Sequence, residues 1–150
     1  MARINLFTGS VFGNAERVAQ HLKGLLIAAG HEVHEGQADI SRFSQPGTVL
    51  NLICTSTTGQ GELPDELYPL WSQLRDQLPQ MPGTYMAVIA LGDSNYESFA
   101  GGGRHFIEVS QEMGMPMLQE PLFIDASEVT DPVSFSDEWA QQLIQSLAQF

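Results

Sequence analysis

Hydrophobic residues along the chain follow two alternating patterns. Short, nearly continuous apolar runs are typical of parallel strands buried on both faces, and they predict strands over residues 4–8, 48–54, 85–91 and 122–124. A more polar run over 31–37 is typical of an edge strand. Apolar residues spaced three and four apart predict helices over residues 15–29, 65–78, 104–113 and 133–147. Asp65 is the expected N-cap of the second helix, and Gly30 ends the first.

Strands that alternate with helices predict an α/β fold, because right-handed crossovers place the helices on both faces of a parallel sheet. We therefore expect a doubly wound, five-stranded parallel sheet. The chain has 150 residues, 43% of them apolar, without a repeat or a linker-like stretch, so one domain over 1–150 is expected. In such sheets ligands bind beyond the carboxyl ends of the strands, where the strand order switches.

The chain is strongly acidic, with 18 acidic and six basic residues and a formal net charge of -12. This charge repels phosphate backbones and anionic lipids, so we expect neither nucleic-acid nor membrane binding. It attracts a partner with a basic face, although acidity can also serve solubility alone. Cys54 ends an apolar run and is expected to be structural. The sequence shows no signal-peptide core and no apolar stretch of roughly 20 residues, which predicts a cytoplasmic protein, expected to be a monomer.

Three loops that follow predicted strands have an unusual composition. The first loop, residues 8–15, places glycine and hydroxyl residues between a strand and a helix, where backbone N–H groups can hold a phosphate. It has neither the Gly-Lys-Ser/Thr ending of a Walker site nor the third glycine of a dinucleotide fingerprint. The second loop, residues 55–65, is rich in small polar residues, and its glycines let a ligand approach the backbone. The third loop, residues 91–103, carries Tyr96, on which a planar ring system can stack.

Taken singly, these loops also fit simpler interpretations, namely an ordinary connection, a solvated loop and a packed surface tyrosine. Taken together and in order, they resemble the loops of the flavodoxin family over essentially the whole chain, and most closely those of its short, single-domain MioC- and YqcA-like group. Residues 8–16 resemble the FMN phosphate loop, residues 55–65 the first isoalloxazine loop and residues 91–97 the second. The resemblance implies a flavodoxin-like sheet with the strand order 2-1-3-4-5.

The resemblance also implies which residues contact FMN. Around the phosphate it places Thr8, Gly9, Ser10, Val11, Phe12, Gly13, Asn14 and Ala15. On one side of the flavin it places Thr55, Ser56, Thr57, Thr58, Gly59, Gln60 and Gly61. On the other side it places Leu91, Gly92, Asp93, Asn95, Tyr96, Phe99 and Gly101, with Tyr96 as the stacking ring. No catalytic residue and no metal ligand is expected.

A protein of this family is expected to carry single electrons from a reductase to acceptor enzymes. The partners expected here are a basic-faced NADPH-flavodoxin/ferredoxin reductase and redox acceptor enzymes. Reorientation of the Gly59 peptide would stabilise the FMN semiquinone by about 1 kcal/mol. Carboxylates near the flavin, among them Glu62 and Glu97, would make the semiquinone/hydroquinone couple low in potential. Phe12 stands where the family usually has threonine and Thr58 where many members have tryptophan, which predicts weaker FMN binding than is typical.

Two other functions on this fold make different demands. A small NAD(P)H-dependent flavin or quinone reductase needs a nicotinamide pocket beside the flavin, for which 150 residues leave little room. A receiver-type signalling domain needs an aspartate after the third strand and a lysine after the fourth or fifth, whereas Cys54 ends the third strand and Lys23 is the only lysine. His31 and His34 are three apart in a predicted strand, so they point to opposite faces and do not predict a metal site.

Overall fold

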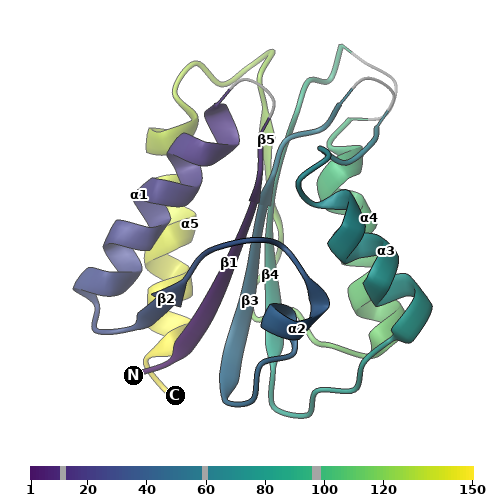
Figure 1. Ribbon diagram of the computed structural model, residues 1–150. Helices are drawn as coiled ribbons and strands as arrows, with labels where there is room; N and C mark the ends of the chain where they lie inside the picture. The colour runs from purple at the N-terminus through teal and green to yellow at the C-terminus, as the bar shows by residue number, and fades with distance from the viewer. Residues whose placement is uncertain (11–12, 59–60, 96–98) are drawn as a thin grey trace.

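The computed structural model describes residues 1–10, 13–58, 61–95 and 99–150. Five parallel strands form one sheet in the order β2-β1-β3-β4-β5 (Figure 1). The predicted α/β class and strand order are therefore confirmed. The strands are β1 (Arg3–Gly9), β2 (Glu32–His34), β3 (Thr48–Thr55), β4 (Tyr85–Gly92) and β5 (Leu122–Asp125).

Helices cover both faces of this sheet. The helices are α1 (Asn14–Ala28), α2 (Ile40–Phe43), α3 (Tyr68–Gln77), α4 (Gly101–Met113) and α5 (Pro132–Leu147). Figure 1 shows α1 and α5 on one face and α3 and α4 on the other. Among the described helices, none has both the length and the apolar character that a membrane crossing requires.

Two hydrophobic cores fill the space between the sheet and its helices. Successive strand residues point to opposite faces, so Leu6 of β1 belongs to the core that includes residues of α1 and α5, while Phe7 belongs to the core that includes residues of α3 and α4. Both side chains are almost completely buried. Burial on both faces explains why β1, β3 and β4 appear in the sequence as continuous apolar runs rather than as alternating ones.

The helix α3 begins three residues later than the apolar pattern predicts, so Asp65 is not its N-cap. Leu67 is the N-cap, and Pro69 lies in the first turn. A helix capped by Asp65 would need the N–H of residue 69 for its first internal hydrogen bond, and proline has none. Proline is well accepted in the first turn, so Pro69 sets the later start.

The helix α4 begins earlier than predicted and includes the three glycines that were expected to lie in the preceding loop. A Cβ on Gly102 would lie 2.5 Å from the carbonyl oxygen of Ser56, and one on Gly103 would lie 2.2 Å from the Cβ of Ala90. Neither position has room for a side chain. The glycines therefore let the first turn of α4 lie directly against β4 and the second loop.

The edge strand β2 is shorter than the predicted run over 31–37, and its register pairs it with Arg3–Asn5 of β1. Beyond its end, the guanidinium group of Arg42 donates hydrogen bonds to the carbonyl oxygens of Leu6, His34 and Gly36. The same group lies 4.0 Å from the centre of the Phe7 ring. Arg42, from the unanticipated helix α2, thus covers part of the β1 edge that a longer β2 would have paired.

Candidate functional site

Hydrogen bonds join the three predicted loops at the carboxyl end of the sheet. The Ser56 N–H donates to the carbonyl oxygen of Gly9 at 2.9 Å, which connects the second loop to the first. The Thr57 hydroxyl donates to the carbonyl oxygen of Leu91 at 2.9 Å and accepts from the Gly102 N–H at 3.1 Å, which connects the second loop to the third. Residues from all three loops therefore lie at one edge of the sheet.

The first loop leads directly into α1. Gly13 is the N-cap of this helix and has a φ of 86°, a conformation that favours glycine. No side chain among the described residues caps α1, so its first N–H groups can take an acceptor from outside the helix. Ser10 shapes the turn, because its hydroxyl accepts a hydrogen bond from the Gly13 N–H at 2.9 Å.

Two charged side chains from outside the first loop also reach it. The Ser10 N–H donates to a carboxylate oxygen of Glu66 at 3.2 Å. The guanidinium group of Arg17 donates to the side-chain oxygen of Asn14 and lies beside Gly13. A carboxylate oxygen on the loop backbone shows that this turn presents an N–H group to an anionic acceptor. The donors here fit an anionic oxygen such as that of a phosphate.

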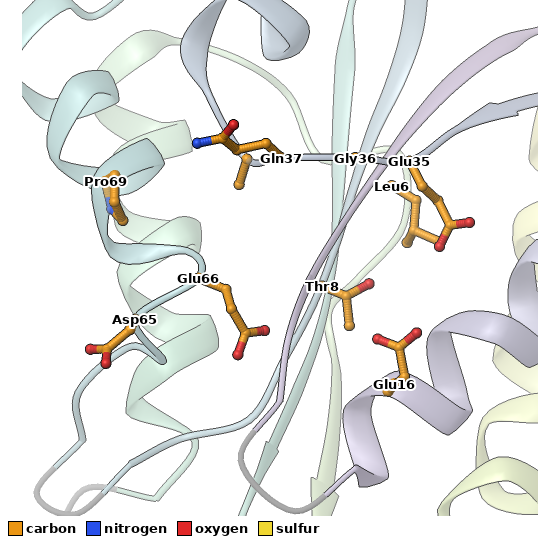
Figure 2. A pocket seen from close by; sticks show the side chains of 10 residues that line it. Leu6, Thr8, Glu16, Glu35, Gly36, Gln37, Asp65, Glu66 and Pro69 are labelled. Carbon is orange, nitrogen blue, oxygen red and sulfur yellow. The ribbon is translucent and has the colours of Figure 1, made fainter.

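A pocket of about 460 Å³ lies beside the open edge of β1. Figure 2 shows the carboxylates of Glu16 and Glu66 near Thr8, the first coming from α1 and the second from the segment before α3. Glu35 also lines the pocket, and a hydrogen bond from Lys23 lowers the pKa of its carboxyl group. The pocket is therefore acidic and favours a cation or a neutral polar group over an anion.

The second loop closes into a tight turn that is held from α4. The carbonyl oxygen of Thr58 accepts from the N–H groups of Gly61 and Glu62, at 2.9 and 3.1 Å. The Thr58 N–H in turn donates to the Glu62 carbonyl oxygen at 2.9 Å. The carbonyl oxygen of Gly61 lies 3.1 Å from Nε2 of His105 in α4.

The third loop is held by β5. The Ser94 N–H donates to the carboxylate of Asp125 at 3.0 Å, and both the N–H and the hydroxyl of Ser127 donate to the same oxygen. These hydrogen bonds hold the pKa of the Asp125 carboxyl group well below its usual range. The Asp93 carboxylate accepts from the Asn95 N–H at 2.9 Å, which shapes the turn itself. The third loop is thus fixed by carboxylates inside and outside it.

The predicted site residues differ in what they offer a ligand. The side chains of Ala15, Thr55 and Leu91 are buried, so only their backbone groups are available. Phe99 packs on Phe123 of β5, with ring centres 6.3 Å apart. Side chains that are partly or fully exposed are those of Thr8, Ser10, Asn14, Ser56, Thr57, Thr58, Asp93 and Asn95. Residues named in the sequence predictions that lie outside the described part of the chain are Val11, Phe12, Gly59, Gln60, Tyr96 and Glu97.

Sequence reasoning missed three residues that hold these loops, namely Arg17, His105 and Asp125; it expected Glu66 among the carboxylates near the flavin but not on the Ser10 N–H. A signal for Asp125 was present, because it ends β5 at the carboxyl edge where ligands bind. Arg17 follows Asn14 by three residues, a spacing that places both on one face of α1. Glu66 and His105 act through contacts distant in sequence, for which the local pattern carries no signal.

Comparison with known proteins agrees with this geometry. The model of the flavodoxin family matches residues 6–139 of the chain. Flavodoxin YqcA of Escherichia coli (strain K12) is 38% identical over 143 residues, which cover 95% of this chain and 96% of that protein. The solved structure of a cysteine-to-alanine mutant of flavodoxin from Pseudomonas aeruginosa is 40% identical, has a TM-score of 0.88, and is matched over 97% of this chain and 99% of the other.

A third similarity is to part of a larger protein. The sulfite reductase [NADPH] flavoprotein alpha-component of Sodalis glossinidius is 35% identical over 148 residues, which cover 97% of this chain but 24% of that protein. The family model and the full-length relative both span nearly the whole sequence. The fold, the arrangement of the three loops and these matches lead to one conclusion: the chain belongs to the flavodoxin family of electron-transfer proteins, whose cofactor is a flavin.

Proposed function

We propose that this protein binds one FMN noncovalently and passes single electrons from a reductase to acceptor enzymes in the cytoplasm. The observation that carries the proposal is the pairing of the Ser10 N–H with a carboxylate in the loop before α1, a helix whose start no described side chain caps. This anion-accepting turn lies at the same edge of the sheet as the second and third loops. One edge therefore offers donors for a phosphate and brings together the two loops proposed to flank a planar ring.

The phosphate of FMN would be held by the first loop. Its acceptor oxygens would take the Ser10 N–H and the first N–H groups of α1, with Arg17 supplying positive charge beside them. Ser10 adds a hydroxyl group, whereas Thr8 lines the acidic pocket, so its proposed contact with the phosphate rests on the family resemblance. The proposed contacts of Val11, Phe12, Gly59, Gln60 and Tyr96 rest on the family resemblance.

The ring system would lie between the second and third loops, and bound FMN supplies the redox chemistry. The chain's own groups orient it and set the charge around it. The backbone of Thr58 and Gly61 would flank one side, and Asp93 and Asn95 the other. Glu62 and Asp93 place carboxylates at this end, which would disfavour added negative charge and so would favour a low-potential semiquinone/hydroquinone couple.

The partners are proposed from charge and from one relative. A net charge of -12 favours docking to a basic face of another protein. The Sodalis relative is named as the flavoprotein of an NADPH-dependent reductase, and this chain matches only about a quarter of it. The relative is in keeping with a reductase partner and the charge with a basic docking face, so the proposed donor is a separate, basic-faced NADPH-flavodoxin/ferredoxin reductase, with redox enzymes as acceptors.

Fluorescence and absorbance of the purified protein test the proposal. Apoprotein should quench the emission of added FMN with one-to-one stoichiometry, and the complex should be yellow and accept electrons one at a time during stepwise reduction. Protein that stays colourless and leaves FMN emission unchanged at micromolar concentrations would refute it. Rapid oxidation of NAD(P)H by the FMN complex without a reductase would favour the alternative of a small flavin or quinone reductase.

A further inference from the structure

His105 joins α4 to the second loop. It follows Gly101 by four residues and therefore lies on the same face of the helix. Its Nε2 atom lies 3.1 Å from the carbonyl oxygen of Gly61, a residue 44 positions earlier. Because a carbonyl oxygen can only accept, Nε2 must carry the hydrogen of this bond.

Gly101 provides the space for that contact. A Cβ at this position would lie 2.6 Å from the carbonyl oxygen of Gly61 and 2.7 Å from its Cα. Side chains on a helix lean toward its N-terminus, so the His105 side chain reaches back over Gly101 toward Gly61. On one face of α4, Gly101 thus allows the close approach to Gly61, and His105, one turn later, supplies the hydrogen bond.

Trp71 of α3 holds the His105 ring from another direction. The two ring centres lie 5.0 Å apart, with an angle of 55° between the planes. Trp71 also packs on Tyr68, with ring centres 5.5 Å apart, and the guanidinium group of Arg75 lies 4.8 Å from the centre of the Trp71 ring. This packing fixes the orientation in which Nε2 faces Gly61.

The Gly61 carbonyl group is the point at which α4 holds the turn. The N–H of Gly61 is already bonded to the Thr58 carbonyl oxygen inside the turn, and Gly61 has a φ of 93°. Its carbonyl oxygen accepts from outside the loop, at His105. Without this bond the turn keeps its internal hydrogen bonds, and the loop stays bonded to α4 only before the turn, where the Thr57 hydroxyl accepts from the Gly102 N–H among the described residues.

We infer that His105 is a positioning residue for the ring of the flavin: by holding Gly61 it keeps the second loop in the conformation that the ring packs against. This inference rests on the proposed function. Loss of the bond would let the turn sample more conformations in the free protein, and FMN binding would then have to order it.

Two variants separate the hydrogen bond from the aromatic packing. His105→Phe keeps a ring beside Trp71 but cannot donate, whereas His105→Gln supplies an N–H group near the position of Nε2. We expect His105→Phe to raise the Kd for FMN about fivefold, as for the loss of one hydrogen bond, and His105→Gln to stay within about twofold of wild type. The Kd for riboflavin, which has the ring but no phosphate, should rise by the same factor in His105→Phe.

The apoprotein gives a second readout without flavin. Amide hydrogen exchange at Gly61 and Glu62 should become faster in His105→Phe and stay near the wild-type rate in His105→Gln. His21→Phe is the matched control, because His21 lies on α1 beside Asp137, away from α4 and the second loop. This control should leave both affinities and both exchange rates unchanged.

The results separate this inference from the proposed function. The inference is overturned if His105→Phe leaves the exchange rates and both flavin affinities unchanged while wild-type protein binds FMN. It is also overturned if FMN affinity falls but riboflavin affinity does not, because the effect would then lie at the phosphate. A wild-type protein that binds neither flavin refutes the proposed function, and the exchange at Gly61 still tests the hydrogen bond.

Discussion

The carboxylate of Glu66 occupies a backbone N–H group that the FMN phosphate would use. A phosphate oxygen that binds the Ser10 N–H must displace this carboxylate, which then stays nearby as a like charge. The substitution Glu66→Gln removes the charge but keeps a side-chain oxygen that can accept from Ser10. We therefore predict that Glu66→Gln binds FMN more tightly than the wild-type protein does.

The size of the effect follows from Coulomb's law and screening. A carboxylate roughly 7 Å from a doubly charged phosphate repels it by about 1.2 kcal/mol in water without salt. Glu66 is exposed, so salt screens this repulsion. Screening leaves about a fivefold gain in affinity at 0.01 M salt, about twofold at 0.15 M and almost none at 1 M.

Flavin fluorescence during titration of apoprotein measures these affinities. Riboflavin has no phosphate, so Glu66→Gln should leave its Kd unchanged at every salt concentration. Glu112→Gln is the matched control, because it makes the same change in net charge at an exposed position near the C-terminal end of α4. The control should leave FMN affinity nearly unchanged.

Two results would refute this reasoning. Equal FMN affinity of wild type and Glu66→Gln at 0.01 M salt would show that Glu66 does not oppose the phosphate. An equal gain for riboflavin would show that the substitution acts on the ring or on the fold rather than on the phosphate.

Three further predictions concern the structure around the site. Asp125→Ala should weaken FMN binding severalfold in titrations, because Ser94 loses its acceptor. The lowered pKa of Asp125 means that this carboxylate stabilises the fold above about pH 4, and that its contribution to stability is lost only as the pH falls further. An Asp125-dependent change in FMN affinity between pH 5 and 8 would therefore contradict the assignment. Gly103→Ala should lower the free energy of unfolding in urea by about 1–3 kcal/mol through overpacking against Ala90, whereas Gly24→Ala, on the exposed face of α1 with open space around it, should raise it by about 0.5–1 kcal/mol. Cys54 should not react with a thiol reagent until the protein unfolds, because complete burial raises the pKa of its thiol; rapid labelling of the native protein would contradict this.

The strands were predictable because their burial on both faces is recorded in the sequence as apolar runs. Two helix starts were predicted wrongly, because apolar spacing says nothing of where the first hydrogen bond can form. The helix α3 begins later because Pro69 lacks an N–H group, and α4 begins earlier because its glycines pack closely against Ala90 and Ser56. Both errors arise from local chemistry that overrides the hydrophobic period.

The loops of the candidate site were predictable from composition and order, but the contacts that hold them were not. Ser10 and Glu66 are 56 residues apart, and Ser94 and Asp125 are 31 apart. Such pairs meet only because the strand order places their elements side by side. No window along one sequence contains both partners, so the structure is needed to find them.

The covering of β1 by Arg42 has a consequence for how copies of this chain behave together. Unpaired backbone along a sheet edge is a template onto which a strand from another molecule can add, and this is a common route to aggregation. The guanidinium group already occupies the Leu6 carbonyl oxygen, and it brings a positive charge to the place where an incoming strand would have to dock. Because β2 is short and Arg42 covers the β1 backbone beyond it, the chain can keep the pocket beside β1 open while β1 is less available to a strand from another molecule.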